Sequence, residues 1–249
     1  MQVEKVRWGG LDAIVAHGLP PDTRPELAVV LCHGFGASGL DLAGLTQAFA
    51  VIRPELLSRV AFIYPAAPLD LASHGIPGGR AWWLIDLDRL LNRPTPELLA
   101  QFRRGCPAGL PEARVLLQGL LDAASLHFEI GLGRIVLGGF SQGSMLATDV
   151  ALRSAVPLAG LCILSGALVN EDEWRALSPP LPLAVFQSHG RQDGILMYPQ
   201  ATALQELLVE KGADVEFMPF PGQHEIPPVV VHRLVAWLEK LLGPLANRA

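Results

Sequence analysis

The sequence predicts an α/β fold in which helices cover both faces of one doubly wound, mostly parallel sheet. Short apolar runs alternate with longer stretches of helical periodicity, and this alternation implies βαβ crossovers. The short runs are apolar throughout, as is typical of parallel strands buried on both faces. Half of the 249 residues are hydrophobic and only 17% are charged, which suits a large core.

The chain is expected to form a single domain over residues 1–249, because no repeat, low-complexity tract or linker divides it. Its net charge is −5, with scattered Lys and Arg, which argues against a nucleic-acid partner. No segment has the features of a secretion signal or the length of a membrane span. We therefore expect a cytoplasmic protein without stable membrane insertion, either a monomer or a homodimer.

The three cysteines are Cys32, Cys106 and Cys162, an odd number that forms no disulfide framework. Cys32 and Cys162 lie inside apolar runs, where a thiol behaves as a small hydrophobe. No CxxC pair or Cys/His cluster indicates zinc, so we expect no metal site, no cofactor and a reducing compartment.

The first element is expected to be an antiparallel hairpin of residues 2–8 and 12–16 at one edge of the sheet, joined by Gly9-Gly10. Buried strands are predicted to follow at Leu27–Cys32, Val60–Tyr64, Arg134–Leu137, Leu158–Leu164, Leu183–Gln187 and Val215–Pro219. Helices are predicted at Leu40–Phe49, Glu112–Phe128, Gly143–Arg153, Gln200–Glu210 and Val229–Leu242, the last on its amphipathic spacing.

Two connections bear on function. Pro65–Pro96 is long and rich in Pro, Gly and aromatic residues, so we expect a functional loop there. The connection after Leu164 is too short for a helical cap. An open active site without a large cap domain is the expected result.

Gly139-Phe140-Ser141-Gln142-Gly143 matches the G-x-S-x-G pattern of a nucleophile elbow, and it lies between a predicted strand and a predicted helix. Glycines on both sides let strand and helix approach while the serine adopts a strained conformation. The alternative is that Ser141 only caps a helix.

A serine nucleophile needs a base, and the chain has seven histidines. His224 is placed best, because its loop follows the last predicted strand and can reach the carboxyl edge of the sheet. His74 lies in the long loop, but nothing in the sequence orients it. The other candidates, in edge or helical positions more typical of surface residues, are His17, His127 and His232.

Asp193 follows the strand before that of His224 and can orient the imidazole. Its rivals are Glu225, which we expect at the start of the last helix, and a polar surface segment that contains Trp174. The carboxylates of that segment are Glu171, Asp172 and Glu173. The order Ser141, Asp193, His224, each after a predicted strand, is the order of the α/β-hydrolase fold.

His33-Gly34-Phe35-Gly36 follows the strand Leu27–Cys32. Such a loop can aim a backbone N–H at an oxyanion, and the second N–H would be that of Gln142, the residue after the nucleophile. The alternative is a glycine-rich turn. His33 itself is expected to be structural.

The chain resembles the phospholipase/carboxylesterase family, which includes acyl-protein thioesterases and small bacterial carboxylesterases. The resemblance rests on the block Cys32–Gly39, on G-F-S-Q-G at residues 139–143, on the H-G-x-x-D block at 189–193 and on Gln223–Pro227. Gly78–Trp83 is similar to the segment of the family's long loop that shapes the acyl groove. Together these matches span residues 30–230.

The resemblance implies a triad of Ser141, Asp193 and His224, with the amides of Phe35 and Gln142 in the oxyanion hole. It implies a serine esterase or thioesterase that forms an acyl-enzyme on a small-molecule or lipid-like acyl ester. The chain departs from the family at Ser144, where a second glycine is usual, and in two segments. Those segments are Gly194–Met197 and Asp86–Glu97, so substrate choice stays open.

Apolar side chains near these motifs are candidates for the acyl pocket: Phe35, Trp82, Trp83, Ile195, Leu196 and Met197. The alternative is that the tryptophans belong to the core. Lysophospholipase or acyl-protein thioesterase activity on longer chains, action on amides or lactones, and a non-catalytic binding module are the other functions considered. A dienelactone-hydrolase-like enzyme is expected to carry Cys at the position of Ser141.

Overall fold

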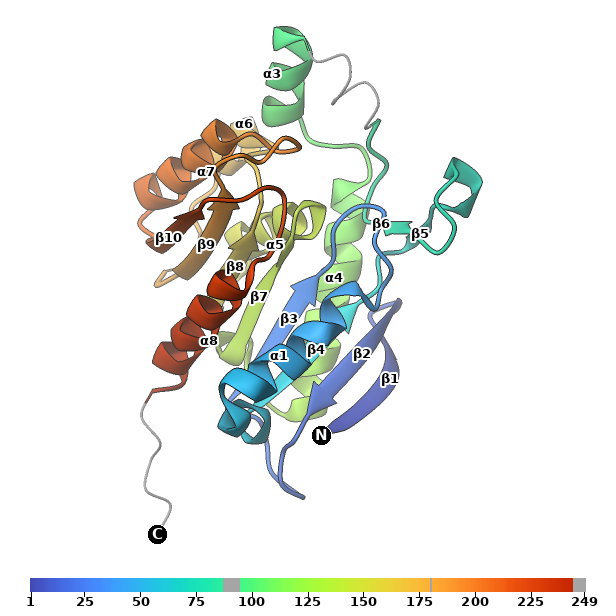
Figure 1. Cartoon of the computed structure of the whole chain (residues 1–249), viewed down its shortest axis with the longest axis vertical. Coiled ribbons are helices and arrows are strands. Elements are labelled where there is room, and N and C mark those ends of the chain that lie inside the picture. Colours follow the sequence, from blue (N-terminus) through green and yellow to red (C-terminus); the bar gives the residue numbers. More distant parts are fainter. Residues whose placement is uncertain (87–94, 180, 244–249) are drawn as a thin grey trace.

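A computed structural model describes residues 1–86, 95–179 and 181–243 and shows eight strands in one sheet (Figure 1). Their order is β1-β2-β4-β3-β7-β8-β9-β10. The strands are β1 (Gln2–Trp8), β2 (Leu11–His17), β3 (Leu27–Cys32), β4 (Val60–Pro65), β7 (Ile135–Phe140), β8 (Gly160–Leu164), β9 (Ala184–Gly190) and β10 (Asp214–Phe220). Strand β1 pairs antiparallel with β2 and β2 antiparallel with β4, whereas all pairs from β4 to β10 are parallel. The predicted α/β-hydrolase fold is confirmed.

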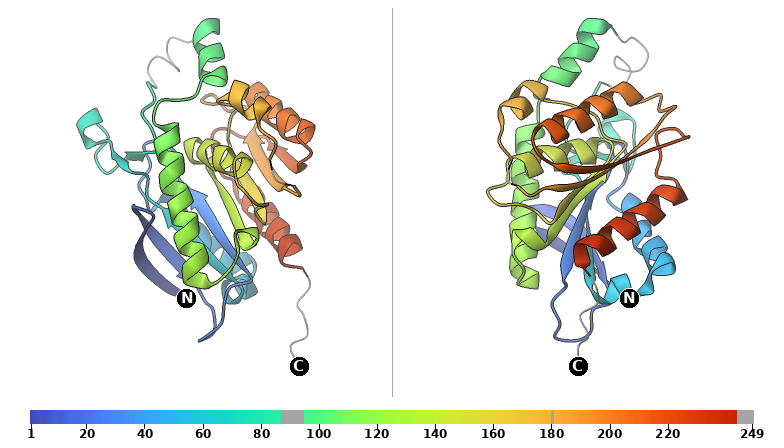
Figure 2. Two further views of the ribbon diagram at one scale, coloured as in Figure 1. Left: turned by 180° about the vertical axis from the view of Figure 1, so that it is seen from behind. Right: turned by 90° about the vertical axis from the view of Figure 1, so that its left-hand side faces the viewer.

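Helices cover both faces of the sheet, as Figure 2 shows from two sides. One face packs against α1 (Leu45–Ile52) and α8 (Pro228–Leu242), with a core cluster of its own. The other face packs against α4 (Leu110–Phe128), α5 (Gln142–Leu152) and α7 (Tyr198–Glu210). All eleven residues of α5 are buried, so this helix is central to the second layer.

The order of the strands fixes where a site can form. Strand β4 lies on one side of β3 and β7 on the other, so the direction of winding changes between β3 and β7. In open α/β sheets, the crevice beyond the carboxyl ends of the strands at such a switch point is where ligands bind. The loop after β3 begins at His33 and the turn after β7 contains Ser141. Both flank this crevice.

Two of the helices in the described part of the chain were not predicted. The first, α3 (Pro96–Arg104), has a sequence signal, since Thr95 accepts a capping hydrogen bond from the Leu98 amide and Pro96 occupies the first helical position. The second, α6 (Glu171–Ala176), lies between β8 and β9. Within the residues described, that connection holds only this six-residue helix, so a large cap domain is absent from the described chain, as predicted.

The segment around α6 corrects another expectation. Trp174 is fully buried rather than part of an exposed segment, and its indole Nε1 donates to Asp149 Oδ1 at 2.7 Å. Glu171 is also buried and binds the guanidinium of Arg103, which ties α6 to α3. Glu171 therefore completes an ion pair between helices.

Other differences are local. The expected helix Leu40–Phe49 is a short 3-10 turn, Asp41–Gly44, followed by α1, and the last helix begins at Pro228, after Glu225. The long loop contains β5 (Leu69–Asp70) and β6 (Arg80–Ala81), which pair antiparallel, with a 3-10 turn at Ala72–His74 between them. The remaining 3-10 turns are Pro54–Ser58 and Leu132–Arg134. Most of Asp86–Glu97 lies outside the described residues. No helix among those described is long and apolar enough to cross a membrane.

Candidate active site

Ser141 stands at the turn between β7 and α5 in a strained conformation, with φ 54° and ψ −121°. Glycines make the turn possible, because a Cβ on Gly143 would lie 2.1 Å from the Cys32 carbonyl oxygen and one on Gly139 2.5 Å from it. Ser141 precedes the first residue of α5, yet its side chain makes no capping hydrogen bond. The helix-capping interpretation of Ser141 is therefore wrong. Strain of this kind is found at functional sites.

Ser144, the departure from the family's usual glycine, is accommodated behind this turn. Its side chain is fully buried, and its Oγ donates to the Ser141 carbonyl at 2.7 Å. Space for it comes from Gly166, where a Cβ would lie 2.3 Å from Ser144 Oγ. The hydroxyl thus supports the turn rather than opening it.

The structure brings Asp193 and His224 together from two loops, with His224 Nδ1 2.7 Å from Asp193 Oδ2. Since a carboxylate oxygen only accepts, Nδ1 carries the proton and Nε2 is left to act as a base. The other oxygen of Asp193 accepts the amides of Ile195 and Leu196, each at 2.9 Å. Burial alone would raise the pKa of this carboxyl, but the hydrogen bonds from His224 and these amides lower it below its usual value.

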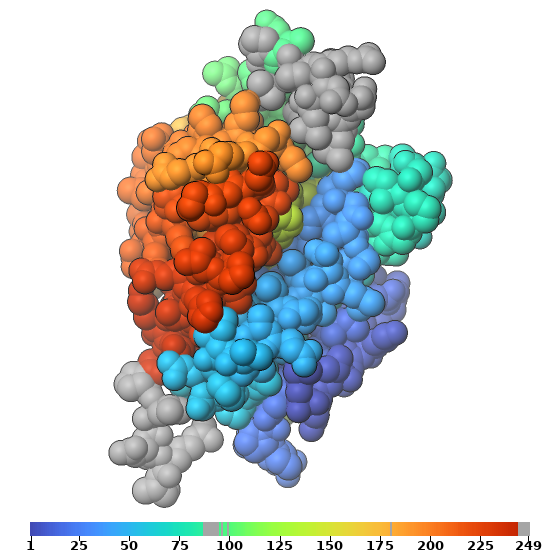
Figure 3. Space-filling model, viewed as in Figure 1, coloured from blue at the N-terminus to red at the C-terminus, as the bar shows by residue number. Residues whose placement is uncertain are grey.

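His224 lies against the residue that precedes Ser141, because the rings of Phe140 and His224 are 4.7 Å apart at their centroids. Among the described contacts, Ser141 Oγ makes no hydrogen bond to His224. Catalytic hydrogen bonds are often loose without substrate and tighten when it binds. In Figure 3 the yellow-green β7–α5 junction shows in a hollow between the blue N-terminal part and the orange-red C-terminal part.

The loop after β3 approaches Ser141 closely, since a Cβ on Gly34 would lie 3.3 Å from Ser141 Cβ. Within the described residues, the backbone amides of Phe35 and Gln142 donate no hydrogen bond. The long loop holds this segment in place, because the Gly36 amide donates to the Arg80 carbonyl at 2.9 Å and the Arg80 amide to the Ala37 carbonyl at 3.0 Å. The amide of Gln142, the residue after Ser141, and that of Phe35, the residue after Gly34, therefore have no acceptor within the described residues.

His33 supports the same loop, as the sequence indicated. Its Nε2 accepts the Ala67 amide at 3.0 Å, so its Nδ1 carries the proton and donates to the Gly34 carbonyl at 2.8 Å. Burial lowers the pKa of this imidazole, which favours the neutral form that both bonds require.

The side chain of Gln142 has a role that the sequence did not suggest. Its Oε1 accepts the Trp82 amide at 3.0 Å, and its Nε2 donates to the Trp83 carbonyl at 2.8 Å. The Trp82 indole in turn donates to the His33 carbonyl at 2.9 Å. Three segments that are distant in sequence are thus joined beside Ser141: the loop after β3, residues 82–83 of the long loop and the β7–α5 turn.

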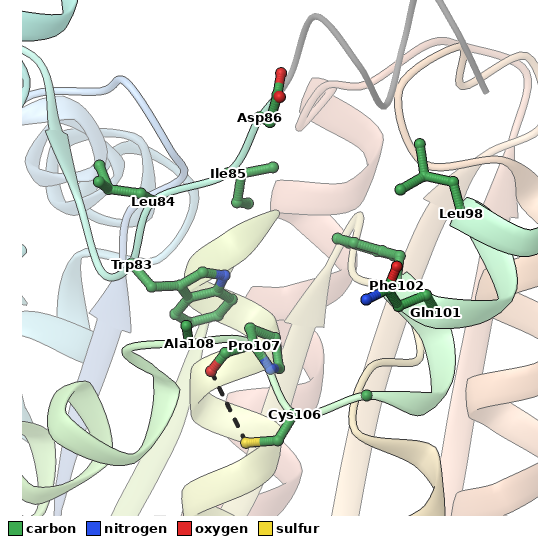
Figure 4. Close-up of a pocket in the computed structure, with 11 residues that line it drawn as sticks. Trp83, Leu84, Ile85, Asp86, Leu98, Gln101, Phe102, Cys106, Pro107 and Ala108 are labelled. Atoms are coloured by element: carbon green, nitrogen blue, oxygen red, sulfur yellow. Dashed lines mark hydrogen bonds between the residues drawn. The ribbon is translucent and has the colours of Figure 1, made fainter. Parts of the chain in front are cut away.

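The predicted acyl-pocket residues do not gather in one place. Trp82 and Leu196 are buried in the core, whereas Ile195 and Met197 are 42% and 45% exposed. Phe35 is half-buried in the loop after β3. Trp83 is buried in the same core as Trp82, and it also lines an apolar cavity of about 400 Å³. Across this cavity Trp83 and Ile85 face Leu98 and Phe102 of α3, whereas the Leu84 side chain points away from α3 (Figure 4). Cys106, Pro107 and Ala108 lie between these two walls.

The other candidate bases and acids lie elsewhere. His17 ends β2, His74 is exposed in the 3-10 turn of the long loop, and His127 and His232 are in α4 and α8. Glu225 is exposed in the loop before α8 and accepts the Gln223 amide at 3.0 Å. Glu171 and Glu173 pair with arginines of the helical layer. Of the rival carboxylates, these three have local partners of their own.

The chain is similar to known proteins over nearly its whole length. The family described as Phospholipase/Carboxylesterase matches residues 16–242. The acyl-protein thioesterase 1 of Mycosarcoma maydis is 29% identical over 231 residues, which cover 88% of this chain and 92% of that protein. The lysophospholipase-like protein 1 of Mus musculus is 27% identical over 227 residues, 88% of each chain.

Solved structures give the same fold. The crystal structure of esterase PE8 superposes with a TM-score of 0.75 at 26% identity, covering 91% of this chain and 99% of that one. The Bacillus cereus carboxylesterase superposes with a TM-score of 0.67 at 19% identity, covering 93% and 94%; at this identity the likeness shows the fold alone.

Proposed function

Because the chain belongs to the phospholipase/carboxylesterase family, whose members are hydrolases that act on esters, we propose that it is a serine carboxylesterase. Its proposed catalytic triad is Ser141, Asp193 and His224. The observation that carries the proposal is the 2.7 Å contact of His224 Nδ1 with Asp193 Oδ2, on loops beside the strained Ser141 turn. Relatives of this chain that are named acyl-protein thioesterases support extending the proposed substrates to acyl thioesters.

In the first step His224 Nε2 takes the proton of Ser141 Oγ, and the oxygen attacks the carbonyl carbon of the ester. The resulting oxyanion accepts hydrogen bonds from the Phe35 and Gln142 amides, which have no other acceptor among the described residues. His224 then gives its proton to the leaving alcohol, and the acyl group stays on Ser141.

In the second step His224 Nε2 takes a proton from water, and the hydroxide attacks the acyl-enzyme. The proton then returns to Ser141 Oγ as the carboxylic acid leaves. Throughout, Asp193 holds the imidazole in one orientation and stabilises it when it is charged. These steps use only protein groups and water.

The cavity beside Trp83 is the best candidate for the apolar part of the substrate. Its walls are mainly hydrocarbon and aromatic, and the Trp83 carbonyl is bound to the side chain of Gln142, the residue after Ser141. The remaining predicted contacts, Phe35, Ile195 and Met197, are at least partly accessible and stay predictions for other parts of the groove. Trp82 and Leu196 are assigned to the core that supports it.

A panel of p-nitrophenyl esters and acyl thioesters of increasing chain length, together with lysophospholipids, tests the function. We expect hydrolysis of the esters, with kcat/KM rising from acetate to hexanoate. Four extra methylene groups buried in the cavity contribute about 3 kcal/mol, or on the order of 100-fold. Highest activity on long acyl thioesters or on lysophospholipids would identify a thioesterase or lysophospholipase, and no turnover of any ester would contradict the proposal.

Filling the cavity should remove the preference for longer chains. Ala108 is exposed at the cavity wall, so Ala108→Phe should place a ring in the space while leaving the core intact. We expect the ratio of kcat/KM for hexanoate over acetate to fall about 10-fold or more, because each buried methylene contributes about 0.8 kcal/mol. Ala100→Phe, an exposed change on α3 outside the lining, is the control and should keep the wild-type ratio. An unchanged ratio of kcat/KM in Ala108→Phe would mean that the acyl chain of the substrate binds in another part of the groove.

A further inference from the structure

A second histidine contacts the carboxylate of Asp193. His189 lies near the end of β9 with its side chain fully buried. Its Nε2 is 2.7 Å from the Leu196 carbonyl oxygen and 3.3 Å from Asp193 Oδ2, the same oxygen that accepts His224 Nδ1. Two imidazoles therefore lie against the oxygen that orients the candidate base, and His224 is the one that hydrogen-bonds to it.

The protonation of His189 follows from its partners. A carbonyl oxygen only accepts, so Nε2 carries the hydrogen. Burial lowers the pKa of this imidazole, so the ring is neutral and Nδ1 carries none. The N–H of Nε2 thus donates to the Leu196 carbonyl, and the same nitrogen lies in contact with Asp193 Oδ2. Within the described part of the chain, Nδ1 has no hydrogen-bond partner.

The loop from Arg191 to Leu196 is fixed at both ends. At its start, the Arg191 amide donates to the Phe220 carbonyl at 2.9 Å and the Gln192 amide to the Gly222 carbonyl at 2.9 Å, which joins it to the segment leading to His224. At the end of the loop, the hydrogen bond from His189 of β9 to the Leu196 carbonyl connects the loop to β9. Between these points Asp193 turns its Oδ2 toward His224.

We propose that His189 is a positioning residue that fixes Asp193 in the orientation needed to hold His224. This inference rests on the proposed function, since it gives Asp193 its orienting role. Packing alone does not account for an imidazole here, because an unpartnered buried nitrogen destabilises the folded state and an apolar side chain of similar size would avoid it. The hydrogen bond from His189 to the Leu196 carbonyl, together with the contact of its ring with Asp193 Oδ2, does account for it.

A double-mutant cycle distinguishes positioning from a structural contribution. His189→Leu removes the N–H and keeps the bulk, and we expect kcat on p-nitrophenyl acetate to fall about 10- to 100-fold with KM within about 2-fold. In the Asp193→Ala background the same substitution should lower kcat by less than about 3-fold, because His189 affects kcat only through the position of Asp193. Residual turnover in that background should still exceed the uncatalysed reaction.

Two further variants complete the experiment. His189→Gln keeps an N–H that reaches the Leu196 carbonyl and should restore kcat to within about 3-fold of wild type. Gln187→Leu removes a buried polar group from the same face of β9 without touching Asp193, and it should leave kcat unchanged. If His189→Leu does not fold, His189→Asn replaces it in both backgrounds, because its shorter amide does not reach Leu196.

Equal losses in both backgrounds, or wild-type kcat in His189→Leu, would overturn the positioning role. A wild type that hydrolyses no ester, or an Asp193→Ala variant with full activity, would overturn the proposed function and the positioning role with it. The two failures are thus distinguishable.

Discussion

Ser141→Ala is expected to lower kcat for ester hydrolysis by about 10⁵-fold or more and to leave the fold intact. The hydroxyl makes no capping hydrogen bond to α5, so its loss removes the proposed nucleophile without removing a structural contact. The measurement is kcat on p-nitrophenyl esters, with thermal unfolding of both proteins to compare stability.

Ser154→Ala is the matched control, since this serine follows α5 at its far end and its hydroxyl donates to the Val156 carbonyl. It should keep wild-type kcat. Turnover by Ser141→Ala within about 10-fold of wild type would exclude an acyl-enzyme on this residue.

Asp193→Asn is expected to lower kcat by about 10⁴-fold, the second largest effect. The amide that replaces the carboxylate can turn its NH₂ toward His224 Nδ1, which favours the tautomer with the proton on Nε2. That tautomer cannot accept the proton of Ser141. The measurement is kcat at neutral pH, where the wild-type carboxyl is ionised because its pKa lies below the usual value.

Glu225→Gln provides the comparison for Asp193→Asn, because Glu225 is the carboxylate adjacent to His224 in sequence but binds the Gln223 amide instead. We expect it to keep wild-type kcat. The opposite pattern, with loss in Glu225→Gln and none in Asp193→Asn, would assign the orienting carboxylate to Glu225.

The sequence predicts the sheet well because its signals are local. Each of the runs predicted as strands overlaps a strand of the structure, since a continuous apolar segment such as Val60–Tyr64 has few other stable environments. The G-x-S-x-G turn is also predictable. Its glycines are required because a Cβ at either position would clash with backbone atoms a few residues away or in the adjacent strand. The order of Ser141, Asp193 and His224 then follows from the order of the strands.

Contacts between segments distant in sequence could not be predicted in the same way. The bond of Gln142 to Trp83 joins residues 59 positions apart, and no local pattern indicates it. Trp174 stands between charged residues, so the sequence predicts that it is exposed. In the structure it is buried because Asp149 of α5 accepts its indole N–H. The two α3 signals, Thr95 and Pro96, were present in the sequence but lay at the end of a loop with little apolar periodicity.

The most direct test of the account is labelling with a fluorophosphonate probe followed by peptide mass spectrometry. A serine nucleophile with a working base attacks the probe, so we expect one adduct per chain, on the peptide that contains Ser141, and none in Ser141→Ala. An unlabelled wild type, or an adduct on any other residue that persists in Ser141→Ala, would contradict the assignment of Ser141 as the nucleophile.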